Sequence, residues 1–132
     1  MPALTVGLSP GHVPANSTER KLLEAYKNID PVISINMVET YGRIHKGGAS
    51  LEDWLVHTAH GDFRNSGKVL LYFGEKESLA FAAPIYKQSL EKAGADYRIH
   101  IEPNMPHCYG AVRINKACRR TYDEYVTCIN EL

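Results

Sequence analysis

Three apolar runs, separated by long segments of helical and polar character, predict the core of a parallel sheet. The run at 69–73 is continuously apolar, as expected for a central strand covered on both faces. The run at 3–8 is also apolar and ends in a Ser-Pro-Gly turn, which predicts a buried strand. In the run at 97–101, apolar and polar residues alternate, which is typical of a half-exposed strand at a sheet edge.

Helical periodicity accounts for most of the chain between and after these strands. It predicts helices over about 18–28, 36–45, 80–93 and 111–129, with a short turn capped by Ser50 and a loop over 57–67. Because helices separate consecutive strands, the strands are expected to be parallel and adjacent. The predicted fold class is therefore α/β, with three parallel strands and flanking helices in a single domain over residues 1–132.

Composition and charge exclude several classes of partner. The chain has 132 residues, enough for one domain with a modest core. Fifteen basic residues balance fifteen acidic ones, so no net field would attract nucleic acid or an anionic membrane. No apolar run approaches the roughly 20 residues of a membrane span, and no basic segment precedes the first apolar run as in a signal peptide.

Cysteine usage favours a reducing compartment. Cys108, Cys118 and Cys128 are odd in number and lack a C-x-x-C spacing, so neither a disulfide framework nor a zinc site is expected. The histidines at 12, 57, 60 and 100 also show no metal-ligand spacing. The sequence thus predicts a cytoplasmic protein with no cofactor and no metal.

Two side chains with catalytic potential follow consecutive predicted strands. Glu77 comes after the run at 69–73 and His107 after that at 97–101, and they are 30 residues apart, about the length of one βαβ unit. Both are expected at the carboxyl edge of the sheet, where open α/β sheets bind ligands. A carboxylate that orients an imidazole makes two thirds of a nucleophilic triad. Taken singly, Glu77 has a plainer interpretation as a solvated loop residue near a helix N-terminus, and His107 as an ordinary loop histidine.

The segments around these residues resemble a known family. "GEKESL", a helix ending in "LEKAGA", a strand and then "PNMPHCYG" resemble the C-terminal part of the α/β-hydrolase fold. The branch is similar to the hormone-sensitive-lipase-like esterases, which include acetyl esterases and sterol-acetate deacetylases. The resemblance implies that Glu77 is the triad acid and His107 the triad base. Acidic residues that are common in the family after the acid are replaced here by Phe81 and Ala82.

A weaker resemblance extends upstream. "ALTVGLSP" is similar to the sixth strand of the family, which often ends in Ser-Pro, and "HGDF" at 60–63 resembles the loop before the seventh strand. Nearly the whole chain therefore corresponds to the last half of an α/β-hydrolase domain.

The triad nucleophile is the missing third of this site. The segment Gly7–Gly11 fits the G-x-S-x-G pattern around Ser9, but Pro10 has no N–H to offer an oxyanion hole and disfavours the strained elbow conformation at Ser9. We therefore interpret Ser9 as a turn residue at the end of a strand. Cys108 is excluded as a nucleophile because adjacent residues in an extended turn point apart.

Two functions remain open. The first is a fragment of a serine carboxylic-ester hydrolase that carries the acid and base but lacks the nucleophile elbow and oxyanion loop, and so is inactive alone. In a complete enzyme its substrate would be a small acyl ester. The alternative is a non-catalytic, truncated protein that pairs with another chain, either a second copy or a complementing N-terminal half. The motive for the alternative is the run at 3–8, which has no earlier strand to pair with.

Overall fold

The three apolar runs form one parallel sheet in the computed structural model, which describes residues 2–47 and 57–132. Strands β1 (Leu4–Leu8), β2 (Lys68–Gly74) and β3 (Tyr97–Glu102) lie in sequential order, with β2 in the centre. Both pairings are parallel. The predicted fold class, α/β with three parallel strands and flanking helices, is confirmed, and so is the edge position of β3.

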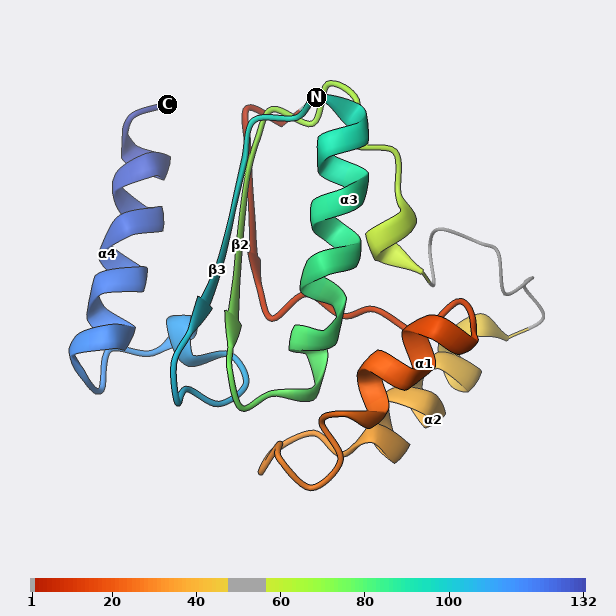
Figure 1. The fold of residues 1–132 in the computed structure, drawn as a ribbon. Coiled ribbons are helices and arrows are strands. Elements are labelled where there is room, and N and C mark those ends of the chain that lie inside the picture. Colours follow the sequence, from red (N-terminus) through yellow and green to blue (C-terminus); the bar gives the residue numbers. More distant parts are fainter. Residues whose placement is uncertain (1, 48–56) are drawn as a thin grey trace.

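The sheet is covered by one helix on each face. Alternate residues of β2 face opposite sides, and both sets are buried. Leu71 and Phe73 belong to the larger core cluster with residues of α3 (Ala83–Ala93), whereas Tyr72 packs in a smaller cluster with residues of α4 (Lys116–Asn130). Figure 1 shows the resulting three layers, with the sheet between α4 and α3.

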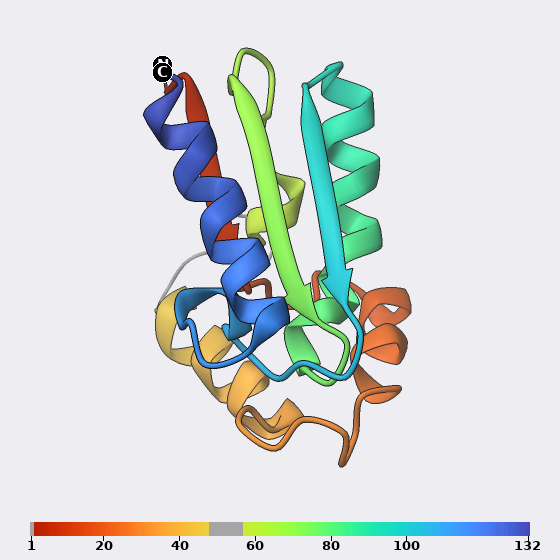
Figure 2. The ribbon, with the colours of Figure 1, turned by 90° about the vertical axis from the view of Figure 1, so that its left-hand side faces the viewer.

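Two further helices lie beyond the carboxyl ends of the strands. Helices α1 (Ser17–Glu24) and α2 (Ile35–Lys46) lie past the arrowheads in both views (Figures 1 and 2). Their N-caps are Asn16 and Ser34, whose side-chain oxygens accept hydrogen bonds from backbone N–H groups of the first turn. This end of the sheet is the one at which the sequence places the candidate chemistry.

Several element boundaries differ from the predicted ones for local reasons. Residues Ser78–Ala82 form a 3₁₀ turn, so α3 begins at Ala83 and not at residue 80, with Pro84 in its first turn, where proline is tolerated. Helix α4 begins only after Asn115, whose side chain caps it, and not at residue 111. Ile114, which precedes the helix, is 80% exposed.

At the N-terminal end, α1 stops at Glu24 instead of continuing to residue 28, and the expected loop over 57–67 contains a short 3₁₀ turn at Thr58–His60. The predicted turn at Ser50 lies outside the described residues. None of the helices in the two described ranges is long and apolar enough to cross a bilayer.

Candidate active site

The turn after β2 buries Glu77 completely. The side chain has 0% exposure, although a solvated loop position was the plain alternative. The next residue anchors the turn: the Ser78 N–H donates to Asp30 Oδ2 at 2.6 Å, and its hydroxyl donates to the Ile33 carbonyl at 2.6 Å. The carboxylate is therefore held by a turn that is tied to the segment between α1 and α2.

The turn after β3 packs directly on the end of β2. The Lys76 N–H donates to the Met105 carbonyl at 3.0 Å. Gly74 leaves the room for this approach, because a Cβ at that position would lie 2.2 Å from the Met105 carbonyl oxygen and 2.5 Å from that of Pro106. A side chain at residue 74 would therefore displace the turn that carries His107.

The structure brings the two predicted site residues together. His107 Nδ1 lies 3.3 Å from Glu77 Oε2, and the histidine side chain is 20% exposed. The alignment is not that of a hydrogen bond: His107 Nδ1 and Glu77 Oε1 have no hydrogen-bond partner among the described residues. Hydrogen bonds in catalytic sites are often long without substrate and tighten when the complex forms. The arrangement fits a carboxylate that orients an imidazole.

Ser9 contacts the carboxylate, a role that the sequence did not predict. Its hydroxyl donates to Glu77 Oε2 at 2.6 Å and accepts the Cys108 N–H at 2.8 Å. Its own N–H donates to the Tyr72 carbonyl at 2.8 Å, which extends the ladder of β1. Ser9 is thus a buried residue at the end of a strand, as expected, but it also connects both site turns.

The conformation of Ser9 corrects one part of the sequence argument. Its φ is +50°, in the left-handed region, although Pro10 was expected to keep it extended. The hydrogen bonds to Glu77 and Cys108 hold the residue in this strained conformation. The other objection to a nucleophilic Ser9 is unaffected, because Pro10 still has no N–H to donate.

The assumption that Cys108 points away from His107 is wrong. Cys108 has φ +55°, so the turn is not extended there, and its Sγ lies 3.2 Å from His107 Nε2. Burial raises the pKa of the Cys108 thiol, and the charge of Glu77 raises it further, against the effect of the hydrogen bond with Ser9. The thiol is therefore protonated at neutral pH, which argues against a reactive thiolate.

A cleft of about 580 Å³ opens beside His107. Its walls are mostly apolar and come from the loop after β1, from α2 and from the 3₁₀ turns; besides His107 they comprise Gly11, His12, Val13, Ile33, Met37, Val38, Tyr41, His45, Thr58 and Leu79. Met37 and Tyr41 in this lining are 51% and 63% exposed. A largely apolar cleft with an imidazole at its margin suits a small organic ligand.

The family of this chain follows from a comparison with family models. The model of an alpha/beta hydrolase fold family matches residues 1–111, which is most of the chain. The chain belongs to this family. The resemblance inferred from the turns around Glu77 and His107 is thereby confirmed at the level of the family.

Solved structures show the same fold. A hormone-sensitive lipase from a metagenome library is similar with a TM-score of 0.78 and 22% identity over 99% of this chain and 45% of that one. An esterase designated E25 is similar with a TM-score of 0.80 and 19% identity over 95% of this chain and 38% of that one. The chain therefore spans less than half the length of these structures. No curated protein matches it in sequence.

Proposed function

We propose that this chain is the C-terminal half of the α/β-hydrolase domain of a serine carboxylic-ester hydrolase, and that it supplies the acid, Glu77, and the base, His107. The observation that carries the proposal is the 3.3 Å approach of His107 Nδ1 to the fully buried Glu77 at the carboxyl edge of the sheet. The similar structures, a hormone-sensitive lipase and an esterase, support the reaction class. Three free cysteines are in keeping with a cytoplasmic location.

In the complete enzyme, a serine on an elbow outside this chain attacks the carbonyl carbon of a small acyl ester. His107 Nε2 takes the serine proton and later returns it to the leaving alcohol, while Glu77 holds the Nδ1–H and stabilises the imidazolium. Ser9 fixes the carboxylate by donating to Oε2. The Cys108 thiol now contacts the same Nε2, so it has to give way when the serine docks.

The 132 residues by themselves are catalytically incomplete under this proposal. An acid and a base serve to activate a nucleophile, and the oxyanion that then forms needs hydrogen-bond donors. The nucleophile and these donors contribute most to acyl transfer. Within the described residues, the hydroxyl that fits an elbow pattern is that of Ser9, and it donates to Glu77. The sequence around it also places Pro10 where an oxyanion donor is required.

The test extends the chain at its amino end with the sequence encoded directly upstream. We expect that sequence to contain a G-x-S-x-G elbow and the extended protein to hydrolyse short-chain nitrophenyl esters, whereas the 132-residue chain does not. In the extended protein, Glu77→Gln and His107→Ala should each lower kcat by about 10⁴-fold, as expected when a triad member is lost. The matched control, His100→Ala, changes a histidine on β3 and should leave kcat unchanged.

Two results would overturn the assignment. If the 132-residue chain is active and Ser9→Ala abolishes its activity, Ser9 is the nucleophile and no second half is required. If the extended protein keeps its activity in both Glu77→Gln and His107→Ala, the pair is not catalytic.

The alternative function, a non-catalytic chain that pairs through its sheet edge, is favoured by one observation. Strand β1 has a neighbour on one side, β2, and none on the other among the described residues. An edge of this kind recruits other strands. Sedimentation velocity tests this pairing: self-association of the 132-residue chain supports it, and a monomer at high concentration counts against it.

A further inference from the structure

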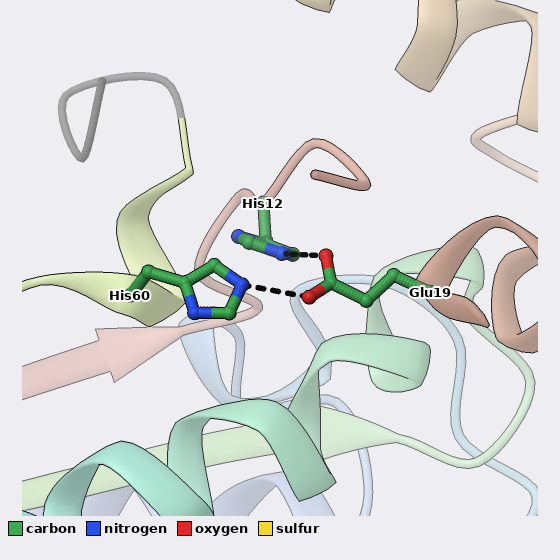
Figure 3. Close-up of side chains that lie close together, drawn as sticks. All are labelled: His12, Glu19 and His60. Atoms are coloured by element: carbon green, nitrogen blue, oxygen red, sulfur yellow. Dashed lines mark hydrogen bonds and ion pairs between the residues drawn. The ribbon is translucent and has the colours of Figure 1, made fainter. Parts of the chain in front are cut away.

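A second cluster of polar side chains joins the loop after β1 to helix α1, and it is independent of the proposed ester hydrolysis. Figure 3 shows His12 from that loop, Glu19 from α1 and His60 from the 3₁₀ turn at Thr58–His60 converging on one point. The three residues come from segments up to 48 positions apart in the sequence, which is why no ligand spacing was visible there.

The side chains of the cluster lie close together in space and are largely buried. His12 Nε2 lies 3.1 Å from Glu19 Oε2, and His60 Nε2 lies 2.7 Å from Glu19 Oε1. The side chains of His12 and Glu19 are almost inaccessible, whereas that of His60 is 41% exposed. One nitrogen or oxygen of each residue lies within 4.8 Å of the other two. The site is thus closed on the protein side and open to solvent at His60.

We propose that His12, Glu19 and His60 bind a divalent transition-metal cation of the zinc class. Two imidazoles and one carboxylate are a ligand set that zinc uses when a fourth position is left to water. With bonds of about 2.0–2.2 Å in a tetrahedral site, the ligand atoms lie roughly 3.4 Å apart. With a single oxygen from Glu19, the three ligand atoms lie within 4.8 Å of one another, so modest side-chain movements bring them to that geometry.

A neighbouring imidazole provides an independent indication of a ligand. His57 is buried, and its ring lies edge-on to that of His12 with 6.0 Å between centroids. Its Nδ1 donates to the Val13 carbonyl at 2.6 Å, and its buried Nε2 has no hydrogen-bond partner in the described part of the chain. A lone pair left unpaired beside the cluster is an acceptor of the kind that a metal-bound water needs.

Binding the cation replaces protons that hold the cluster together in the metal-free protein. The Ala59 N–H donates to His12 Nδ1 at 3.2 Å, so the neutral ring carries its proton on Nε2 and donates it to Glu19. Coordination through Nε2 moves that proton to Nδ1, and the contact with Ala59 is given up. At 3.2 Å this contact is the longest of the hydrogen bonds around the cluster.

The cation would join helix α1 to two segments that border the cleft beside His107. His12 and Thr58 line the cleft, and His60 closes the same turn as Thr58. The proposed role is therefore to fix one wall of the cleft.

The experiment titrates Zn²⁺ into the 132-residue chain by calorimetry. It uses a Cys108→Ser background, so that the thiol beside His107 does not compete. We expect one saturable site per chain. His60→Ala and Glu19→Gln should each weaken binding at least by the roughly 10–100-fold that losing even a supporting group costs at a metal site. The matched control is His100→Ala, which also removes a histidine paired with a buried glutamate, Glu102, and should bind as the parent does.

Spectroscopy and folding checks make the outcomes decisive. Co²⁺ in place of zinc should give visible bands of a nitrogen- and oxygen-ligated site that disappear in His60→Ala. Circular dichroism verifies that each variant is folded, and because His60 is partly exposed, His60→Ala carries the test if Glu19→Gln unfolds. No saturable binding by the folded parent would mean a hydrogen-bonded cluster only, and equal binding by a folded His60→Ala would place the ion elsewhere. Either result overturns the proposal.

Discussion

Two buried carboxylates beside histidines, Glu19 and Glu77, differ in how many hydrogen bonds they accept. Glu19 accepts four hydrogen bonds, two on each oxygen, from His12, Ala15, Asn16 and His60. Glu77 accepts one, from Ser9, while its second oxygen has no partner among the described residues and His107 approaches without hydrogen-bond alignment. We call Glu19 the complete carboxylate, because both of its oxygens accept hydrogen bonds, and Glu77 the incomplete one, because one of its oxygens accepts none from the described residues.

The electrostatics of the first carboxylate fit this difference. Burial raises the pKa of Glu19, but the Ala15 N–H and the two imidazoles outweigh it, so the pKa ends below its ordinary value. Burial also lowers the pKa of His12 to about 4, against the pull of Glu19, so the ring is neutral at neutral pH. An unsatisfied buried polar group in a native protein calls for an explanation, and the catalytic role proposed for Glu77 supplies one.

The largest expected effect comes from damaging the complete carboxylate. Glu19→Gln replaces one acceptor oxygen by a donor that faces other donors, and each buried group left unpaired costs about 1–3 kcal/mol. We expect a loss of about 3 kcal/mol in the free energy of unfolding, measured by urea denaturation with a chelator present.

The matched control for this substitution is Glu39→Gln. Glu39 pairs with Arg20 at the surface, and both side chains are more than one third exposed, so the change should stay within about 0.5 kcal/mol. A Glu19→Gln variant as stable as Glu39→Gln would show that the four hydrogen bonds do not distinguish the two carboxylates.

The next effect tests whether backbone packing, rather than bonds to the carboxylate, builds the Glu77 site. Gly74→Ala puts a methyl group 2.2 Å from the Met105 carbonyl oxygen. The turn must move, which should cost about 2 kcal/mol in unfolding free energy.

Gly11→Ala is the control for Gly74→Ala, because nothing lies within 4 Å of the position of its Cβ. It should change stability by less than about 1 kcal/mol. Under the proposed function, Gly74→Ala should also lower kcat in the extended protein, since His107 follows the displaced turn. Wild-type stability and kcat in Gly74→Ala would contradict the packing argument.

The fold was predictable because its signals are local and repetitive. The continuous apolar run of β2, the alternation in β3 and the helical segments between them define a βαβ arrangement without tertiary information. The same arrangement placed Glu77 and His107 at one edge of the sheet. Boundaries were less accurate where side chains decide them, as at Asn115, whose cap sets the start of α4.

The remainder of both sites depends on contacts between distant segments. Ser9 reaches Glu77 across 68 residues, and this contact overrides the preference of a residue before proline for extended backbone. The left-handed turn at Cys108 brings its thiol to the adjacent imidazole, which an assumption of extended backbone had excluded. The His12–Glu19–His60 cluster has no sequence spacing of its own, so only the folded chain shows it.

An intermediate effect on the free energy of unfolding is expected at a third carboxylate, Glu102, smaller than at Glu19 and larger than at Glu77. Arg120 and His100 both contact its Oε2. Burial raises the pKa of Glu102, but these two partners lower it below its ordinary value. A lowered pKa stabilises the folded state above the pKa of the unfolded chain, and this contribution is lost as pH falls through the folded pKa.

Acid unfolding measures this contribution. Between pH 6 and pH 3 the parent should lose about 1 kcal/mol more unfolding free energy than Glu102→Gln, the size of a hydrogen bond to a charged partner near the surface. Urea denaturation of both proteins at each pH gives the difference. Identical losses in the two proteins would show that the Glu102 carboxylate makes no pH-dependent contribution to stability.

The smallest effect on stability is expected at the incomplete carboxylate. Glu77→Gln keeps the volume of the side chain and an oxygen that can accept from Ser9, and it removes a buried charge that has little compensation among the described residues. We expect the free energy of unfolding to stay within about 1 kcal/mol of the parent, in either direction, by urea denaturation at pH 7. Under the proposed function, the same substitution should nevertheless remove nearly all activity from the extended protein, so its effects on stability and on kcat should differ. A loss as large as that of Glu19→Gln would mean that Glu77 serves the fold and not the reaction, because a carboxylate kept for catalysis contributes little to folding.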